Sequence, residues 1–221
     1  MATLSTIREQ VRAKADIQND GNHISDSEVD GFINDSIRLL HSLLVDGTDG
    51  QLFAKNAPVL AKLGTHSYQL PSDFSQLVSV DIRVQNWYVR SVAADPQDYA
   101  QLSDLEDYGN WTPRRHFLRW NLEQARGELF IFPTPTATSD VAVQYIPSAP
   151  QLSLDSDTLE WPDFWHQWVV FDAAIQCVNK SDEGMKGNAL QIERDRVEKR
   201  IRDHIRSMSV TRIKTIRPWS Y

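Results

Sequence analysis

The chain has 221 residues, of which 41% are hydrophobic and 24% are charged. These fractions match soluble globular proteins and exclude a disordered or low-complexity chain, and the length suits one larger domain or two small ones. The single cysteine, Cys177, excludes an intrachain disulfide and a thiolate cluster for zinc or iron–sulfur. The chain has no apolar run of about 18–20 residues and no apolar signal segment, so we expect cytoplasmic synthesis and no membrane insertion.

Charge is distributed unevenly along the chain. The 23 basic and 30 acidic residues give a formal net charge of −7, which argues against a general nucleic-acid binder held by phosphate contacts. Residues 190–221 contain nine basic and four acidic side chains, which leaves 14 basic and 26 acidic ones, a net charge of −12, in the rest. An acidic body therefore carries a basic tail.

The last residues of that tail, 209–221, alternate basic with β-branched or aromatic side chains. They have no helical stripe, so we predict an extended arm that docks on a partner; a frayed terminus is the alternative. The candidate contact residues are Arg206, Arg212, Ile213, Lys214, Ile216, Arg217, Trp219 and Tyr221.

Two helices are predicted near the N-terminus. Thr3 is a suitable cap for a short first helix, and Ser25 with Glu28 forms a capping box that begins a second one. The second helix ends near Gly47 and needs an apolar partner, for which the first helix is the nearest candidate. Its apolar residues recur at helical spacing and are predicted to be core: Val29, Phe32, Ile33, Ile37 and Leu40.

The middle of the chain changes to short runs rich in Val, Ile and aromatic residues, separated by Pro, Gly, Asn and Asp. These runs predict a mostly antiparallel sheet, with a hairpin turn at Gln85-Asn86 and one brief helix from Asp95-Pro96 to Leu105. The predicted strands are 67–70, 77–84, 87–92, 116–120, 128–132 and 141–146.

Two further helices are predicted after the sheet. Pro162 opens the first, which ends around residues 181–187, and the second spans about 188–208 with an apolar stripe and a face of alternating charge. Their predicted core or subunit-packing residues are Trp165, Trp168, Ile201 and Ile205. The fold class is therefore α+β: a helical bundle formed by residues 1–66 and 151–208, a β-rich domain at 67–150, and an extended arm at 209–221.

The sequence shows no motif of a catalytic, cofactor-binding or metal site. The chain contains no phosphate-binding glycine loop, nucleophile elbow or His-Glu-x-x-His motif, and its six histidines show no metal-ligand spacing. Asp155, Asp157 and Glu160 lie in an acidic, flexible-looking segment and are interpreted as solvated. Trp161, Trp165 and Trp168 share one helical face, which favours packing over a sugar-stacking platform.

The order of these elements resembles the head-to-tail adaptor proteins of tailed bacteriophages. The similarity lies in the Ser25-to-Glu28 helix start, the segments LPSDF (70–74), GELFIFPTP (127–135) and VQYIP (143–147), and the closing helix pair with its basic tail. The chain looks most like the short-tailed phage adaptors, also called head-completion or tail tubular proteins. This resemblance covers essentially the whole chain, with short motifs whose order carries the match.

The resemblance implies a structural virion protein at the portal vertex, made in the host cytoplasm. Twelve copies would form a ring that joins the portal protein to the tail nozzle protein and extends the channel through which genomic DNA passes without sequence-specific binding. The helices would face neighbouring adaptors, the β domain would meet the nozzle, and residues 206–221 would reach the portal. The acidic body would repel DNA phosphates, so that the genome slides through.

Two alternatives remain open from the sequence. One is a virion-associated cell-wall hydrolase that uses the carboxylates of Asp155, Asp157 and Glu160. The other is a monomeric carbohydrate- or protein-binding module with an exposed face of tryptophans from Trp161 to Trp168.

Overall fold

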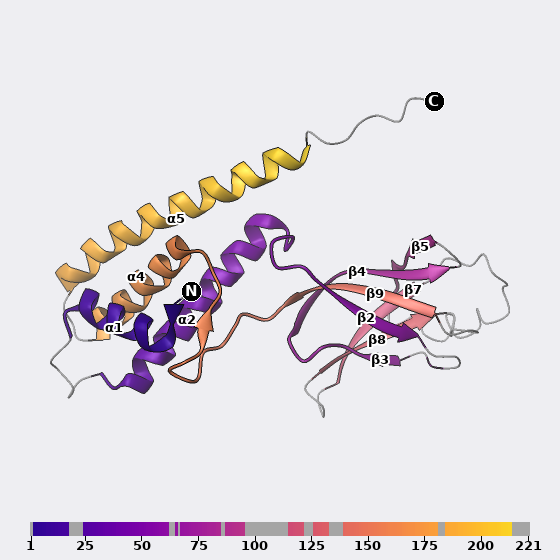
Figure 1. Ribbon diagram of the computed structural model, residues 1–221, viewed down its shortest axis with the longest axis horizontal. Coiled ribbons are helices and arrows are strands. Elements are labelled where there is room, and N and C mark those ends of the chain that lie inside the picture. The colour runs from indigo at the N-terminus through magenta and orange to yellow at the C-terminus, as the bar shows by residue number, and fades with distance from the viewer. Residues whose placement is uncertain are drawn as a thin grey trace. The chain divides into compact units, whose positions relative to one another are not determined.

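The computed structural model describes residues 2–17, 24–61, 65, 67–84, 87–95, 115–121, 126–132, 139–180 and 184–213. The chain divides into two compact units (Figure 1). The helical unit comprises Met1–Asp49 and Ala149–Tyr221, and the β unit comprises Gly50–Ser148. The predicted α+β class is confirmed.

The helical unit contains four helices within the described residues: α1 (Leu4–Ala15), α2 (Asp26–Thr48), α4 (Asp163–Lys180) and α5 (Gly184–Ile213). Thr3 caps α1 through its side chain, and Ser25 and Glu28 form the predicted capping box of α2. Two short strands, β1 (Ala2–Thr3) and β10 (Thr158–Leu159), pair antiparallel beside them. Local sequence signals therefore set both N-terminal helix starts.

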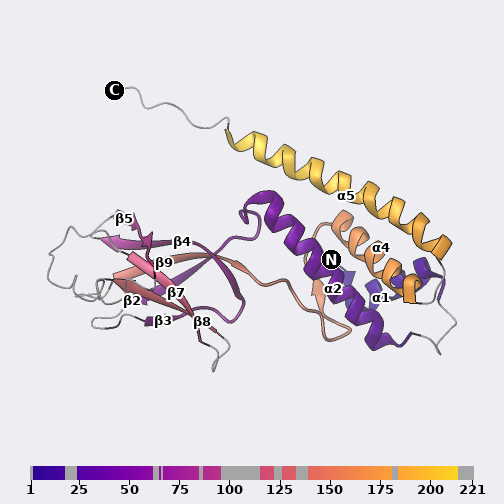
Figure 2. The ribbon, with the colours of Figure 1, turned by 180° about the vertical axis from the view of Figure 1, so that it is seen from behind.

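Helix α4 is the common packing partner in this unit, in contact with α1, α2 and α5 (Figure 2). Its residues Trp168, Val169, Ala173 and Cys177 are almost completely buried. Helix α2 contacts α1, its predicted candidate partner, and contacts α4 more extensively. A helix that is apolar on several sides is driven to the centre of a bundle by burial on each of those sides.

Helix α5 begins earlier and ends later than the sequence predicts. It starts at Gly184 instead of residue 188, and it continues through residues 209–213, which the sequence analysis expects to be extended. Val197, Ile201 and Ile205 of this helix are buried. A helix that has begun can extend by further residues at little cost, because each added residue makes one further backbone hydrogen bond.

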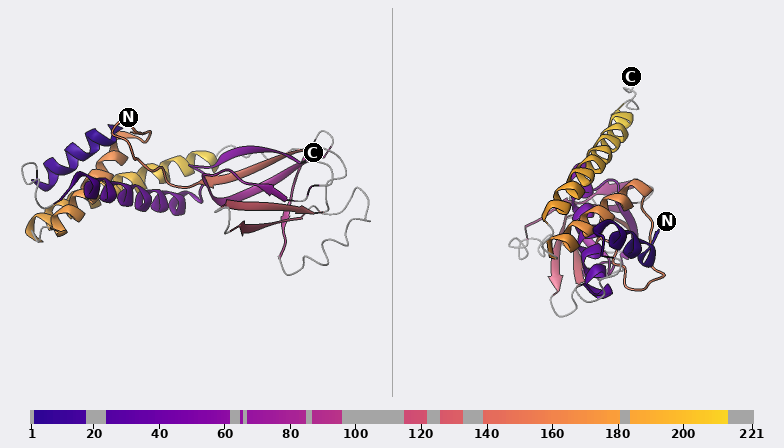
Figure 3. Two further views of the ribbon diagram at one scale, coloured as in Figure 1. Left: turned by 90° about the horizontal axis from the view of Figure 1, so that it is seen from below. Right: turned by 90° about the vertical axis from the view of Figure 1, so that its left-hand side faces the viewer.

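The strands in the described part of the β unit form two four-stranded sheets. Figure 3 shows these strands from two further directions. One has the order β2 (Lys55–Ala61), β9 (Ser139–Pro147), β4 (Phe74–Val84), β5 (Trp87–Arg90), with every pair antiparallel. The other has the order β3 (Ser67–Gln69), β8 (Arg126–Phe132), β7 (Arg115–Asn121), β6 (Val92–Ala93). In the second sheet only the β6–β7 pair is parallel.

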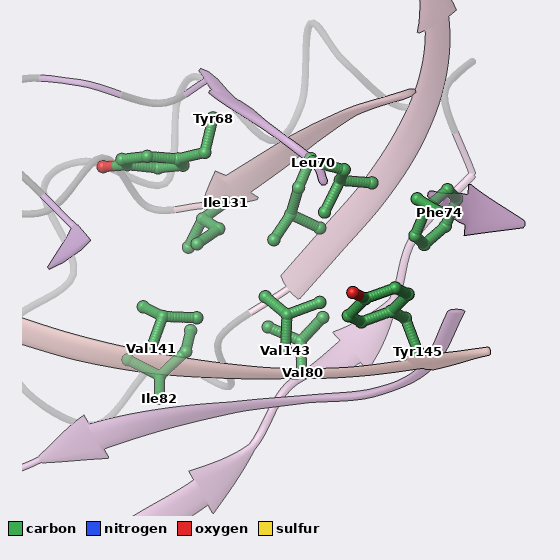
Figure 4. Packing of buried hydrophobic residues seen from close by; sticks show 10 residues of the cluster. Tyr68, Leu70, Phe74, Val80, Ile82, Ile131, Val141, Val143 and Tyr145 are labelled. Atoms are coloured by element: carbon green, nitrogen blue, oxygen red, sulfur yellow. The ribbon is translucent and has the colours of Figure 1, made fainter. Parts of the chain in front are cut away.

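The apolar core of the β unit lies between these two sheets (Figure 4). Ile131 of β8 faces Val80, Val141 and Val143 of β4 and β9, and Leu129 belongs to the same buried cluster. The alternate residues of β8 point to the opposite side of that sheet, where Phe130 and Phe132 stack with Phe117. The period-2 alternation of a strand explains how one segment contributes to both clusters.

One strand of the β unit has no counterpart in the sequence prediction. Strand β2 contains Pro58, which cannot donate a backbone hydrogen bond and therefore obscures a strand pattern. The strand lies at the edge of its sheet and pairs only with β9, a position that tolerates proline. Strands β4 and β5 pair as the predicted hairpin, whereas its turn at residues 85–86 and most of the helix predicted at 95–105 lie outside the described residues.

Candidate docking surfaces

The structure places only part of the predicted arm. Arg206 is exposed on α5 and lies 3.8 Å from Asp203. Arg212 and Ile213 belong to the last turn of α5. The other five arm residues lie outside the described residues: Lys214, Ile216, Arg217, Trp219 and Tyr221. Helix α5 therefore contains the first part of the predicted arm, up to Ile213.

The candidate packing residues lie inside the helical unit with one partial exception. Phe32 is half-buried. The others are almost completely buried: Val29, Ile33, Ile37, Leu40, Trp165, Trp168, Ile201 and Ile205. They come from α2, α4 and α5, so the structure brings three segments of the sequence into one core.

The tryptophans do not form an exposed stacking face. Trp165 and Trp168 are 4% and 1% exposed, and Trp161 packs edge-on against Trp165 with ring centroids 5.8 Å apart. The indole N–H of Trp168 donates to Glu198 of α5 over 3.3 Å. A flat sugar-binding platform needs exposed rings, so these indoles act as packing groups.

A buried carboxylate joins three helices of this unit. Asp172 of α4 accepts hydrogen bonds from Ser36 of α2 at 2.9 Å and from Gln176 at 3.1 Å. Its other oxygen lies 3.0 Å from Arg194 of α5. Sequence reasoning missed this cluster, although an aspartate within the apolar run WVVFDAAI was a visible signal. Full pairing of a buried charge is what makes its burial tolerable.

The segment before α4 is pinned to the N-terminal helices. Arg8 makes a two-pronged contact with Asp30 at 2.7 and 2.8 Å and also contacts Asp155 at 2.8 Å. The backbone N–H of Leu4 donates to the carbonyl of Asp157 over 2.9 Å. Arg8 and Asp155 are 147 positions apart. These contacts join the N-terminal helix α1 to the segment that precedes α4.

Asp155 and Asp157, two of the carboxylates that a hydrolase would use, make contacts that stabilise the fold. The side chain of Asp157 accepts hydrogen bonds from the backbone N–H groups of Leu154 and Ser153, which lower its pKa. Asp155 is paired with Arg8. A general acid needs a raised pKa, which is the opposite of the shift at Asp157.

Two grooves run along α5. The leucine groove, between α2 and α5, has a volume of about 220 Å³ and is lined by Leu40, Leu43, Leu44, Ile201, Ile205 and Arg202 among others. The cationic groove, between α1, α4 and α5, has a volume of about 520 Å³. Its residues include Lys14, Val170, Phe171, Arg196, Val197 and Arg200. Both grooves belong to the helical unit and offer concave surfaces for a partner.

The β unit exposes apolar side chains of its own. Tyr88 and Val89 of β5, Val92 of β6 and Trp120 of β7 are all exposed. Nearby, the imidazole of buried His116 lies 3.0 Å from the hydroxyl of Ser91, and burial lowers its pKa. Aromatic and branched side chains on a surface are typical of contacts with other proteins.

No group of three metal-ligating side chains occurs within the described ranges. The thiol of Cys177 is buried in α4, and burial raises its pKa to about 11. In the same part of the chain, no helix combines the length and apolar character that crossing a bilayer requires.

Comparison with known proteins identifies the family. The family model described as SU10 adaptor protein matches residues 2–213, which include the described parts of both units. No curated protein matches the chain. The resemblance to head-to-tail adaptors is thus confirmed at the level of the family, and such a family implies a virion component associated with portal and tail. The chain belongs to the SU10 adaptor protein family of structural bacteriophage head-to-tail connectors.

Proposed function

We propose that this protein is one subunit of a ring, of twelve copies as in the adaptors it resembles, that joins the portal to the tail nozzle and extends the DNA channel. The observation that carries the proposal is the family match over residues 2–213, because it covers both units instead of one shared fragment. A connector needs separate surfaces for separate partners. Two units with independent cores supply such surfaces.

Residues 206–221 act as the portal-binding arm in this proposal. Four cationic residues alternate there with Ile213, Ile216 and Trp219, and no acidic residue follows Asp203. A segment of this composition suits an acidic surface with apolar pockets. Each arm adds modest affinity, and simultaneous engagement by all copies of a closed ring multiplies it.

The charge of the body fits passage of DNA. Residues 1–189 carry a net charge of −12, from 14 basic and 26 acidic side chains. An acidic channel wall repels phosphates, and the genome then slides without adhering. The protein performs this role without catalysis, in agreement with the paired and hydrogen-bonded state of Asp155 and Asp157.

The test is the copy number of the chain in intact virions, measured by quantitative mass spectrometry against the portal subunit of the same phage. We expect equal numbers of the two proteins. Absence of the chain from purified particles would overturn the proposal and return attention to a soluble binding module.

A second measurement tests the arm. A chain ending at Ile213 retains every described turn of α5, and we expect it to remain folded and to lose association with the portal. The matched control replaces residues 214–221 by a Gly/Ser segment of equal length, which should behave like the truncation. Normal portal binding by either variant would remove residues 214–221 from the mechanism.

A further inference from the structure

We propose that the turn around Leu154 in one copy docks into the cationic groove of a second copy. The Leu154 turn comprises residues 153–157, and the cationic groove is the one lined by Lys14, Phe171 and Arg200. This inference rests on the proposed ring and names the contact between neighbouring subunits.

The Leu154 turn is rigid and presents an apolar side chain to solvent. The carboxylate of Asp157 accepts from the backbone N–H groups of Ser153 and Leu154 at 2.7 and 2.8 Å. The N–H of Asp157 donates to the carbonyl of Leu154 over 2.9 Å. Leu154 is nevertheless 65% exposed. A leucine held outward in a fixed conformation loses little conformational entropy on binding.

The turn is also anchored to its own subunit. Leu152, which precedes it, is buried, and its backbone N–H and carbonyl each make a 2.9 Å hydrogen bond with the side chain of Asn34 on α2. Asp155 contacts Arg8 of α1. These contacts fix the turn to α1 and α2 of its own subunit.

The turn lies in an acidic stretch. Residues 149–163 contain Asp155, Asp157, Glu160 and Asp163 and no lysine or arginine. The side chains of Asp155 and Asp163 are 71% and 93% exposed. The turn therefore offers an exposed leucine within a segment of negative net charge.

The cationic groove has the complementary chemistry. Among the described residues, Lys14 and Arg200 have no carboxylate partner, whereas Arg196 is paired with Glu193. The ammonium of Lys14 lies 5.3 Å from the ring centroid of Phe171. The groove is also lined by Phe171, which is half-buried, and by Val170 and Val197, which are almost completely buried. An apolar anchor with flanking acids fits a pocket of this kind, and opposite charges set the orientation of docking.

The two surfaces lie on opposite flanks of α1. Successive residues of a helix are separated by about 100° of rotation, which places Arg8 and Arg12 on one side of the buried Leu4, Ile7 and Val11 stripe and Lys14 on the other. The Arg8 side holds the Leu154 turn, and the Lys14 side borders the groove. Contact between unlike surfaces is head-to-tail, the geometry from which rings close.

The test is a disulfide trap in virions assembled from chains that carry Leu154→Cys together with Ala13→Cys, since Ala13 is exposed and lines the groove. Native Cys177 is buried and does not compete. After mild oxidation we expect a ladder of covalent oligomers on a non-reducing gel. The control pairs Leu154→Cys with Ile192→Cys, which is 55% exposed on α5 and is not among the groove residues, and it should give no ladder.

A single substitution tests the same contact if the double-cysteine chain fails to assemble. Leu154→Lys should lower incorporation of the chain into virions by about tenfold or more, because it removes the apolar anchor and brings an added cation against Lys14 and Arg200. Ile192→Lys should incorporate normally. Normal incorporation of Leu154→Lys, or chains present at portal copy number without a ladder, would overturn the contact. Absence of the wild-type chain from virions would instead overturn the proposed function and, with it, this contact.

Discussion

Different interactions stabilise the helical unit and the β unit. The helical unit unites the two ends of the sequence, and polar contacts such as Arg8–Asp155 and Asp172–Arg194 cross between distant segments. The β unit is one continuous segment, residues 50–148, and its two sheets enclose an apolar core. Substitutions near either end of the chain should therefore destabilise the helical unit first and leave the β unit folded.

The largest expected effect on stability comes from placing a charge in the core of the helical unit. Val29→Asp should destabilise that unit by about 4 kcal/mol, because Val29 is completely buried and a carboxylate there has no partner. Hydrogen exchange followed by mass spectrometry should show loss of protection in α1, α2 and α4 but not in β4 and β9. Leu39→Asp, on the exposed side of the same helix, is the control.

The reciprocal change addresses the β unit. Leu129→Ala should cost about 3 kcal/mol, because Leu129 is completely buried between the sheets and truncation leaves a cavity. Protection should fall in β3, β7 and β8 and remain in α4. Leu118→Ala, at a partly exposed position of β7, should be nearly neutral. Equal loss of protection in both units would mean that they unfold together.

A smaller loss of stability is expected when a buried polar contact of the helical unit is removed. Asp172→Ala should destabilise the helical unit by about 2 kcal/mol, because Arg194 and Ser36 lose their shared partner. The loss is moderated by Asp195, which remains 3.0 Å from Arg194. Thermal unfolding measures the change, and the double variant Asp172→Ala with Arg194→Met should recover part of the stability. No recovery would show that the two residues are not coupled.

The smallest expected effect is on acid stability. Glu28 has a pKa lowered to about 2 from 4.5, first by the hydrogen bond from Lys180 and then by those within the α2 capping box. Because the folded pKa is depressed, its contribution is present above about pH 4.5 and is lost as the pH falls toward 2. The melting-temperature difference between wild type and Glu28→Gln should therefore vanish by about pH 2. A difference independent of pH would contradict this origin.

Most of the fold could be predicted, whereas the candidate surfaces could not. The α2 capping box and the buried stripe of that helix are local features of sequence, and so are the alternating strands of the β unit. Strand β2 was missed because Pro58 interrupts its pattern. The Asp172 cluster and the cationic groove were missed because their members come from separate helices.

The sequence alone predicts the type of most elements and the starts of α1 and α2, because caps, turn residues and hydrophobic period act over fewer than about ten residues. Its order of elements was also sufficient to indicate the adaptor family. Only the tertiary structure decided that α4 is the shared partner of three helices and that Asp155 returns to Arg8. Such pairings depend on the free energy of burial and charge pairing summed over the whole unit, which no local pattern contains.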